Sequence, residues 1–218
     1  MTAGRTGLRE QKKQATRQAL REAAWRLALE RGPDNVRVDD IAEAAGVSPR
    51  TYNNYYSSRE QAIVAAVTAE RESRVAAAIA ARPDDVRLAD AVADAIVEQY
   101  TDPGAQDGDA LLLITTSPAL REAFVDAAAA IEHPLTDAIA GRLGDAHRDT
   151  ARVLAASVAA AVRVALDRWV GSPAAASSVA GGLVVPSGSL PGLLRAALAP
   201  LAPALDAAER RAAPARHD

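Results

Sequence analysis

The sequence of 218 residues contains no cysteine, which excludes disulfide bonds, thiolate-bound zinc, iron–sulfur clusters and cysteine nucleophiles. Histidine is scarce as well, and His133, His147 and His217 have none of the spacings found in metalloenzyme motifs. His133 and Asp137 form an i, i+4 pair that is able to bind a metal ion, but solvated pairs of this type are far more common in helices. We therefore expect no catalytic residue, no metal site and no cofactor.

Long hydrophobic runs are also missing. No stretch of 18 or more apolar residues occurs, which argues against a transmembrane helix. The segment 1–17 is polar and basic and lacks the apolar core of a secretory signal. These two observations predict a cytoplasmic protein without a membrane partner.

Lysine is almost absent, since Lys12 and Lys13 are the only two in the chain. The charges are unevenly distributed: residues 1–60 carry 11 Lys and Arg against 8 Asp and Glu, and residues 61–218 carry 14 against 20. A basic head on an acidic body fits a protein that binds a polyanion at one end. The basic cluster nearest the N-terminus is either a solvated tail or an arm that lies over a nucleic-acid backbone. Its members are Arg5, Arg9, Lys12, Lys13 and Arg17.

Alanine is abundant, and apolar residues recur at three- and four-residue steps in segments that glycine and proline separate. The pattern predicts an all-α protein of about nine helices, with a three-helix head at 1–57 and a larger helical body at 58–218. Pro134 is expected to kink one helix, and Pro200 and Pro203 to bend the last one. The expected helices span 8–31, 39–45, 49–56, 58–81, 84–100, 107–116, 118–141, 146–170 and 190–211. The intervening segment 171–188 is expected to be a loop, with 182–186 as a weak strand candidate.

Residues 38–61 have the layout of a helix-turn-helix, in which two short helices flank a turn containing Gly46. Ser48 and Pro49 are favoured residues for the start of the second helix. That helix, expected at 49–56, is almost devoid of aliphatic residues, unlike a buried helix. Its polar side chains suit phosphates and base edges of DNA. They are Arg50, Thr51, Asn53, Asn54, Tyr55 and Tyr56.

This stretch resembles the DNA-binding head of the TetR family of bacterial regulators over about 50 residues. The residues that carry the resemblance are VDDIA at 38–42, AGVS at 45–48, TYNNYY at 51–56 and SRE at 58–60. The resemblance implies that Tyr52 and Tyr56 are core residues. It also implies a set of residues that touch DNA, to which we add Arg37. The whole set is Arg37, Ser48, Arg50, Thr51, Asn53, Asn54, Tyr55 and Arg59.

Three positions in the head depart from the family pattern. Ala28 replaces a common bulky aromatic residue of the first helix, and we expect Trp25 to fill that space. Arg37 replaces the usual Thr, so it cannot cap the following helix, and we expect Asp39 to take over that role. Arg59 replaces the usual Lys and keeps the positive charge. Ser58 to Gln61 also reads as a capping box at the start of the fourth helix.

For the body, the resemblance implies a homodimer built from the two helices at 146–170 and 190–211, with small residues such as Ala155, Ala159 and Ala197 at the interface. A homodimer implies a palindromic operator in double-stranded DNA. The segments 8–13, 53–56 and 117–121 resemble a subgroup with an acyl-CoA-like ligand. The expected ligand-binding residues are Leu112, Thr115, Phe124, Arg163 and Trp169.

The function implied is that of a repressor which a small apolar or acyl-type ligand releases from its operator. Two alternatives stay open on the sequence. One is a helical enzyme that depends on a metal or ligand, for which no motif is visible. The other is an architectural DNA-binding protein without a ligand, for which the long apolar body has no obvious use.

Overall fold

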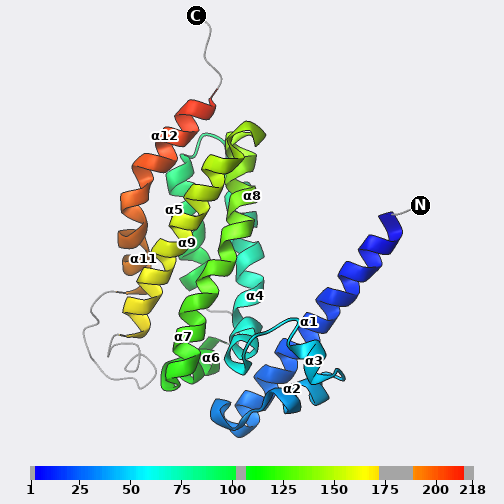
Figure 1. Ribbon diagram of the computed structural model, residues 1–218. Coiled ribbons are helices and arrows are strands. Elements are labelled where there is room, and N and C mark those ends of the chain that lie inside the picture. Colours follow the sequence, from blue (N-terminus) through cyan, green and yellow to red (C-terminus); the bar gives the residue numbers. More distant parts are fainter. Residues whose placement is uncertain (1–2, 102–106, 172–188, 214–218) are drawn as a thin grey trace, which may run out of the picture. The chain divides into compact units, whose positions relative to one another are not determined.

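The computed structural model describes residues 3–101, 107–171 and 189–213, and every regular element within these ranges is a helix (Figure 1). The all-α class is therefore confirmed. The expected loop at 171–188, with its weak strand candidate, lies outside the described residues except for Gly171. None of the described helices is both long enough and apolar enough to cross a membrane.

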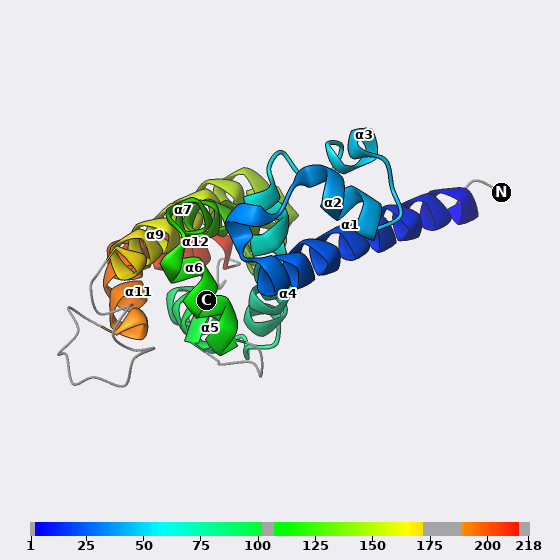
Figure 2. The ribbon, with the colours of Figure 1, turned by 90° about the horizontal axis from the view of Figure 1, so that it is seen from below.

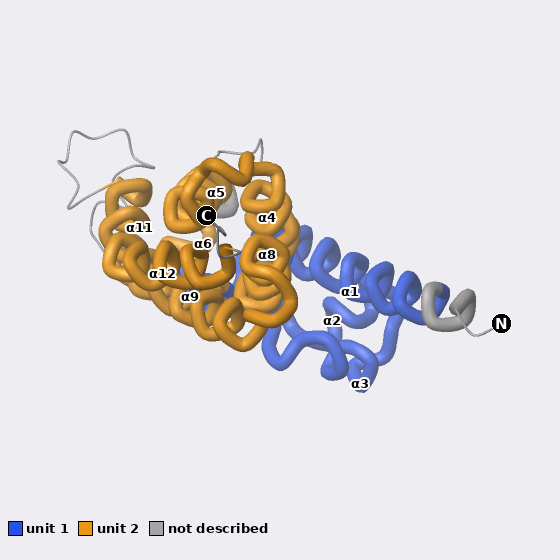
Figure 3. The backbone as a smooth tube through the Cα atoms, turned by 90° about the horizontal axis from the view of Figure 1, so that it is seen from above, with its two compact units in different colours: residues 1–68, 116–127 blue, residues 69–115, 128–218 orange. Residues whose placement is uncertain are grey.

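The chain divides into two compact units (Figure 3). The first contains residues 1–68 and 116–127, and the second contains residues 69–115 and 128–218. The boundary expected after residue 57 falls inside the first unit, just before a helix that continues into the second.

The first unit is a helical head whose core is formed mainly by its long first helix. This helix, α1, begins at Ala3, five residues earlier than expected, and buries the face that the periodicity indicates: Leu20, Ala24 and Ala28 are fully buried. The elements of this unit are α1 (Ala3–Arg31), η1 (Pro33–Asn35), α2 (Val38–Ala44), α3 (Pro49–Tyr52), the first part of α4 (Arg59–Ala80) and α7 (Pro118–Ala127).

The turn between α2 and α3 requires glycine at one position. Gly46 has a φ of 68°, and a Cβ atom there would meet nothing within 4 Å, so the backbone conformation and not lack of space selects glycine. The N–H groups of Gly46 and Val47 donate to the carbonyls of Glu43 and Ala42 at 3.0 and 2.9 Å, which satisfies the end of α2. Ser48 caps α3 as expected, since its Oγ accepts from the Thr51 N–H at 3.1 Å.

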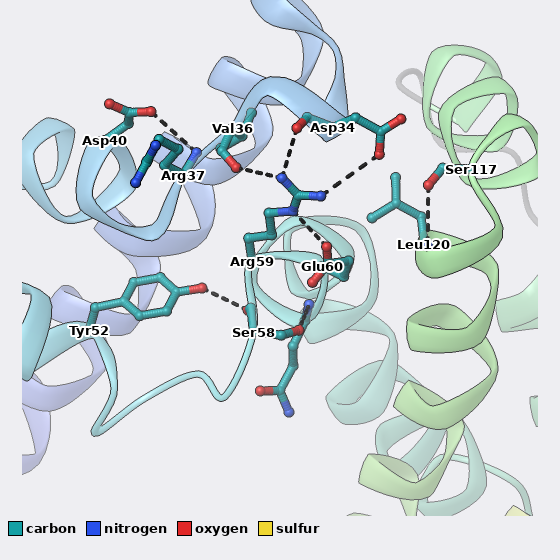
Figure 4. Close-up of polar contacts among 11 residues, drawn as sticks. Asp34, Val36, Arg37, Asp40, Tyr52, Ser58, Arg59, Glu60, Ser117 and Leu120 are labelled. Carbon is teal, nitrogen blue, oxygen red and sulfur yellow. Dashed lines mark hydrogen bonds and ion pairs between the residues drawn. The ribbon is translucent and has the colours of Figure 1, made fainter.

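Two local predictions for the head were wrong. The α-helical part of α3 ends at Tyr52 and not at Tyr56, and the chain continues in tight turns to Tyr56. Asp39 does not cap α2. The helix begins one residue earlier, and the backbone N–H of Arg37 donates to the Asp40 carboxylate at 3.2 Å (Figure 4). The third residue of the helix thus binds the N–H of the residue before the helix, as the acidic member of a capping box does.

The second unit is a bundle in which α9 packs against α8 and α11, and α5 packs against α11 and α12. Besides the rest of α4, it contains α5 (Leu88–Thr101), α6 (Asp107–Thr116), η2 (Ala128–Ile131), α8 (Glu132–Leu143), η3 (Asp145–His147), α9 (Arg148–Val170), α11 (Leu190–Leu198), η4 (Ala199–Leu201) and α12 (Ala202–Ala212). The apolar side chains between these helices are Ala, Val, Leu and Ile.

Of the two bends expected at prolines, the one at Pro134 is absent and the one at Pro200 is present. The break in the segment 118–141 lies at Ala128–Ile131, before Pro134. Pro134 itself falls in the first turn of α8, where its missing N–H has no helical partner to lose. The C-terminal segment does change course at its prolines, because η4 with Pro200 separates α11 from α12.

A polar network ties the start of α5 to α8 and α12. The Arg142 side chain, 10% exposed, donates from Nη2 to the Val86 carbonyl at 2.6 Å and pairs with Glu209 at 3.1 Å. The other carboxylate oxygen of Glu209 accepts from the Leu88 N–H at 3.0 Å. The expected start of α5 was Asp84, but the helix begins at Leu88. The cap that Glu209 supplies to the Leu88 N–H accounts for this later start.

Candidate nucleic-acid interface

Two buried tyrosines hold the turn after α3 in place. Tyr52 is fully buried, and its O–H donates to the Ser58 carbonyl at 2.7 Å (Figure 4). Burial, and next the negative charge of Glu60, raise the pKa of Tyr52, so the phenol stays protonated and keeps donating. Tyr56 is 6% exposed, and its O–H donates to the Arg17 carbonyl at 3.3 Å. The prediction that both are core residues is confirmed.

This anchoring leaves the polar residues between the two tyrosines on the outside. Asn53 and Asn54 are exposed, and Tyr55 is half-buried. Arg50, which precedes Tyr52 on α3, is exposed as well. Arg37, which precedes α2, is exposed too. Among the residues that the structure describes, neither Arg37 nor Arg50 has an ion-pair partner within 4.0 Å. These side chains are therefore available to a partner outside the chain.

Ser48 and Thr51 are already engaged with each other. Besides the cap, the two hydroxyls share a hydrogen bond of 2.9 Å. Both hydroxyls keep acceptor lone pairs, but their orientation is set by the cap. Their expected contact with DNA stays a prediction, and the structure adds a structural role that fixes the first turn of α3.

Arg59 was expected to contact DNA, but its guanidinium is bonded to other residues of the head. Its Nη1 donates to the carbonyls of Asp34 and Val36, both at 2.9 Å, and its Nη2 lies 3.8 Å from the Asp34 carboxylate (Figure 4). Its Nε donates to Glu60 at 2.6 Å. Every nitrogen of the guanidinium thus faces an acceptor within the head. Arg59 clamps the first residue of α4 to the loop between α1 and α2.

Glu60 completes this clamp. Partial burial raises the pKa of Glu60, but the hydrogen bond from Arg59 and smaller contributions from its own backbone N–H and Ser58 outweigh it, so the pKa lies below its ordinary value. A carboxylate with a lowered pKa stabilises the fold above its ordinary pKa, and this contribution is lost as the pH falls through the lowered value. At neutral pH the clamp is fully charged.

The five residues expected to bind a ligand are not brought together in a described cavity. Phe124 belongs to the first unit and is buried. The other four belong to the second unit, where Leu112 and Arg163 are exposed, and Thr115 and Trp169 are half-buried. Their role as a ligand site stays a prediction.

The i, i+4 pair of His133 and Asp137 exists, with Nε2 and Oδ2 3.8 Å apart. Arg148 also pairs with Asp137, at 2.6 Å, so this carboxylate already has a cationic partner. Across the described ranges, no group of three His, Asp or Glu residues is arranged to hold a metal ion.

Sequence reasoning missed two functional neighbours in the head. Asp40 was not recognised as the acceptor that caps α2, although its position three residues after Arg37 matches the acidic member of a capping box. The partners of Arg59 in the loop at 34–36 gave no signal at all, because they lie 23 to 25 residues away in the chain.

The geometry of the first unit defines a helix-turn-helix head with an exposed polar second helix. Residues 20–66 match the family described as bacterial regulatory proteins, tetR family, and residues 86–206, more than half of the chain, match the MftR C-terminal domain. The chain is also similar to the HTH-type transcriptional regulator TcmR of Streptomyces glaucescens, with 37% identity over 71 residues. That match covers 33% of this chain and 31% of the relative. The chain therefore belongs to the TetR family of bacterial regulatory proteins.

The clamp can be separated from a phosphate contact by substituting Arg59 with lysine. An ammonium keeps the charge but cannot reach two carbonyls and Glu60 as a fork. We expect Arg59→Lys to lower the free energy of unfolding by about 1–3 kcal/mol, measured by urea denaturation, whereas a residue that only contacts a phosphate would tolerate lysine without loss of stability. Arg50→Lys, at an exposed position, is the control and should unfold like the wild type. Wild-type stability of Arg59→Lys would contradict the clamp.

Proposed function

We propose that this chain is a transcriptional repressor that binds a palindromic operator as a homodimer and leaves it when a small apolar or acyl-type ligand binds the body. The observation that carries the proposal is the exposed polar surface of α3 and its following turn, which two buried tyrosines hold in a fixed conformation. Residues positioned so rigidly have little conformational entropy to lose when they contact DNA.

The exposed side chains divide by chemistry into two groups. Arg50 and Arg37 carry charges suited to phosphates, and Arg50 is also able to reach a guanine edge. Asn53 and Asn54 present amides that match adenine in the major groove. Asn53 is the C-cap residue that follows α3, and its backbone N–H donates to the Pro49 carbonyl at 3.1 Å, so its amide side chain projects from a constrained backbone. We assign base reading to Asn53 and phosphate binding to Arg50.

The outer face of α9 supports the homodimer. Val153 and Val164 are 66% and 54% exposed, and they lie on one face because 11 residues make about three helical turns. Ser157 and Ala160 lie between them at heptad-like spacing, and neither is buried. A groove of about 450 Å³ continues this face between α9 and α12, where Leu154 and Ala208 contribute to its lining. A second copy of the chain would cover these apolar groups.

Two of the small residues expected at the dimer interface lie instead in the core of the second unit. Ala155 and Ala159 are buried within the chain itself, so they allow close packing of α9 inside the second unit. Ala197 is half-buried on α11. The interface that we propose therefore rests on the exposed valines and not on these alanines.

The base and phosphate assignments predict different effects on DNA binding. Asn53→Ala should cost about 1–3 kcal/mol of binding to the operator and relax the preference at one base pair. Arg50→Gln should weaken binding to every duplex and make the log–log salt slope shallower by about 0.9 for each phosphate that the variant leaves unneutralised. The measurement is fluorescence anisotropy with a duplex selected from a random library by the wild-type chain. Unchanged sequence preference in Asn53→Ala would overturn its assignment.

If the exposed face of α9 forms the dimer interface, a charge at Val164 should separate the two copies. Val164→Glu would bury like charges against each other across a two-fold axis, so we expect a single chain of 22.6 kDa in sedimentation velocity, where the wild type gives twice that mass. Leu29→Glu is the matched control, because Leu29 is 49% exposed on α1, which belongs to the first unit. A Val164→Glu protein that sediments like the wild type would remove α9 from the interface.

The effector proposal predicts a coupling between ligand and DNA. A long-chain acyl-CoA should weaken operator binding about 5- to 150-fold, whereas coenzyme A alone should not. Arg163→Gln should reduce this response if Arg163 meets the ligand, and Arg168→Gln, also exposed on α9, should not. Release by the free fatty acid alone would indicate an apolar ligand without the nucleotide. Operator binding unaffected by all three compounds would refute the acyl-type effector.

A further inference from the structure

The amino-terminal part of α1 is a helix with almost no packing partner. Every residue from Leu8 to Ala15 is exposed, as are Arg17 and Gln18, and Leu8 alone is 59% exposed. Burial begins only at Leu20. Within the head, this part of α1 extends past α2 and α3 in both views (Figures 1 and 2). We call residues 8–18 the arm.

The arm is strongly basic in a chain whose net charge is −3. It holds four basic residues and one acidic residue, Glu10, and it contains both lysines of the chain. Arg9, Lys13 and Arg17 follow each other at steps of four residues, which places their charges about 6 Å apart along the helix. The arm's basic side chains have no ion-pair partner in the part of the chain that the structure describes.

These charges continue the face of α1 that packs into the head. Lys13 lies seven residues before Leu20 and Arg9 eleven residues before it, so both fall within about 20° of Leu20 around the helix. Leu20 is fully buried, and within this unit α1 packs against η1 and α2. Arg9 and Lys13 therefore lie on the side of α1 that, further along the helix, faces the rest of the head.

The carboxyl-terminal end of the arm lies next to the turn that follows α3. The Tyr56 O–H donates to the Arg17 carbonyl at 3.3 Å, which joins the end of that turn to the last turn of the arm. A duplex that contacts Arg50 and Asn53 would thus run close to the start of a row of positive charges. Phosphates occur about every 3.4 Å along each strand of the duplex, so such a row meets a dense line of negative charge.

We propose that the arm binds the phosphate backbone of the DNA that flanks the half-site contacted by α3. This inference rests on the proposed function, because it takes DNA as the partner of the head. It assigns to the arm a contribution to affinity that does not depend on base sequence. The helix fixes the spacing of these side chains along one face, so fewer backbone conformations are lost on binding than in an unstructured tail.

The test compares two double variants of the full chain that remove the same charge. Arg9→Gln with Lys13→Gln changes the arm, and Arg26→Gln with Arg74→Gln changes exposed helical positions elsewhere. Glutamine preserves helix propensity, which circular dichroism would verify. Binding is measured over a range of salt concentrations to a duplex selected by the wild type, with and without about 10 flanking base pairs on each side.

We expect the arm variant to have a salt slope shallower by about 0.9 for each phosphate that the arm no longer neutralises, and only on the duplex with flanks. The control variant should keep the wild-type slope on both duplexes. Equal slopes for the arm variant and the wild type would overturn the inference, and so would an equal decrease in both variants, which would reflect net charge alone. A wild type that selects no duplex would instead refute the proposed function.

Discussion

The burial of Tyr52 and Tyr56 is the constraint on which the head depends. The two rings lie 6.0 Å apart, and each hydroxyl donates to a carbonyl of a different helix or its flanking turn. A stretch of only a few residues, too short to be stable as a helix by itself, is thereby fixed between α1 and α4. Because the aromatic side chains face inward, the polar ones between them have to face outward. The exposed polar surface of the candidate nucleic-acid interface therefore follows from the burial of the two tyrosines in the core.

Much of this head could be predicted from the sequence, because it is determined by local rules. Gly46 is needed for a backbone with positive φ, and Ser48 and Ser58 cap the helices that follow them. The buried face of α1 follows from the three- and four-residue spacing of its apolar side chains. The aromatic residues of the helix-turn-helix were identified as core from the family resemblance, and their burial agrees.

What could not be predicted depends on residues that meet only after folding. Arg59 looked like a simple replacement of one cation by another, and nothing near it in the sequence indicated the carbonyls of the loop at 34–36. Pro134 was expected to kink a helix, but the helix had already been interrupted by the turn at 128–131. Candidates for the ligand site came from resemblance and composition, and neither determines which side chains line one cavity.

The cap that α12 supplies to α5 has a consequence for biosynthesis. Glu209 accepts from the Leu88 N–H across 121 positions of the chain, and Arg142 joins the same carboxylate. During translation, the start of α5 therefore leaves the ribosome long before its cap has been made. The Leu88 N–H and the Arg142 guanidinium both lack this carboxylate until Glu209 in α12 has been synthesised. Non-local closure of this kind slows folding and prolongs the exposure of apolar surface. The contacts at the start of α5 are therefore complete only after residue 209 has been synthesised.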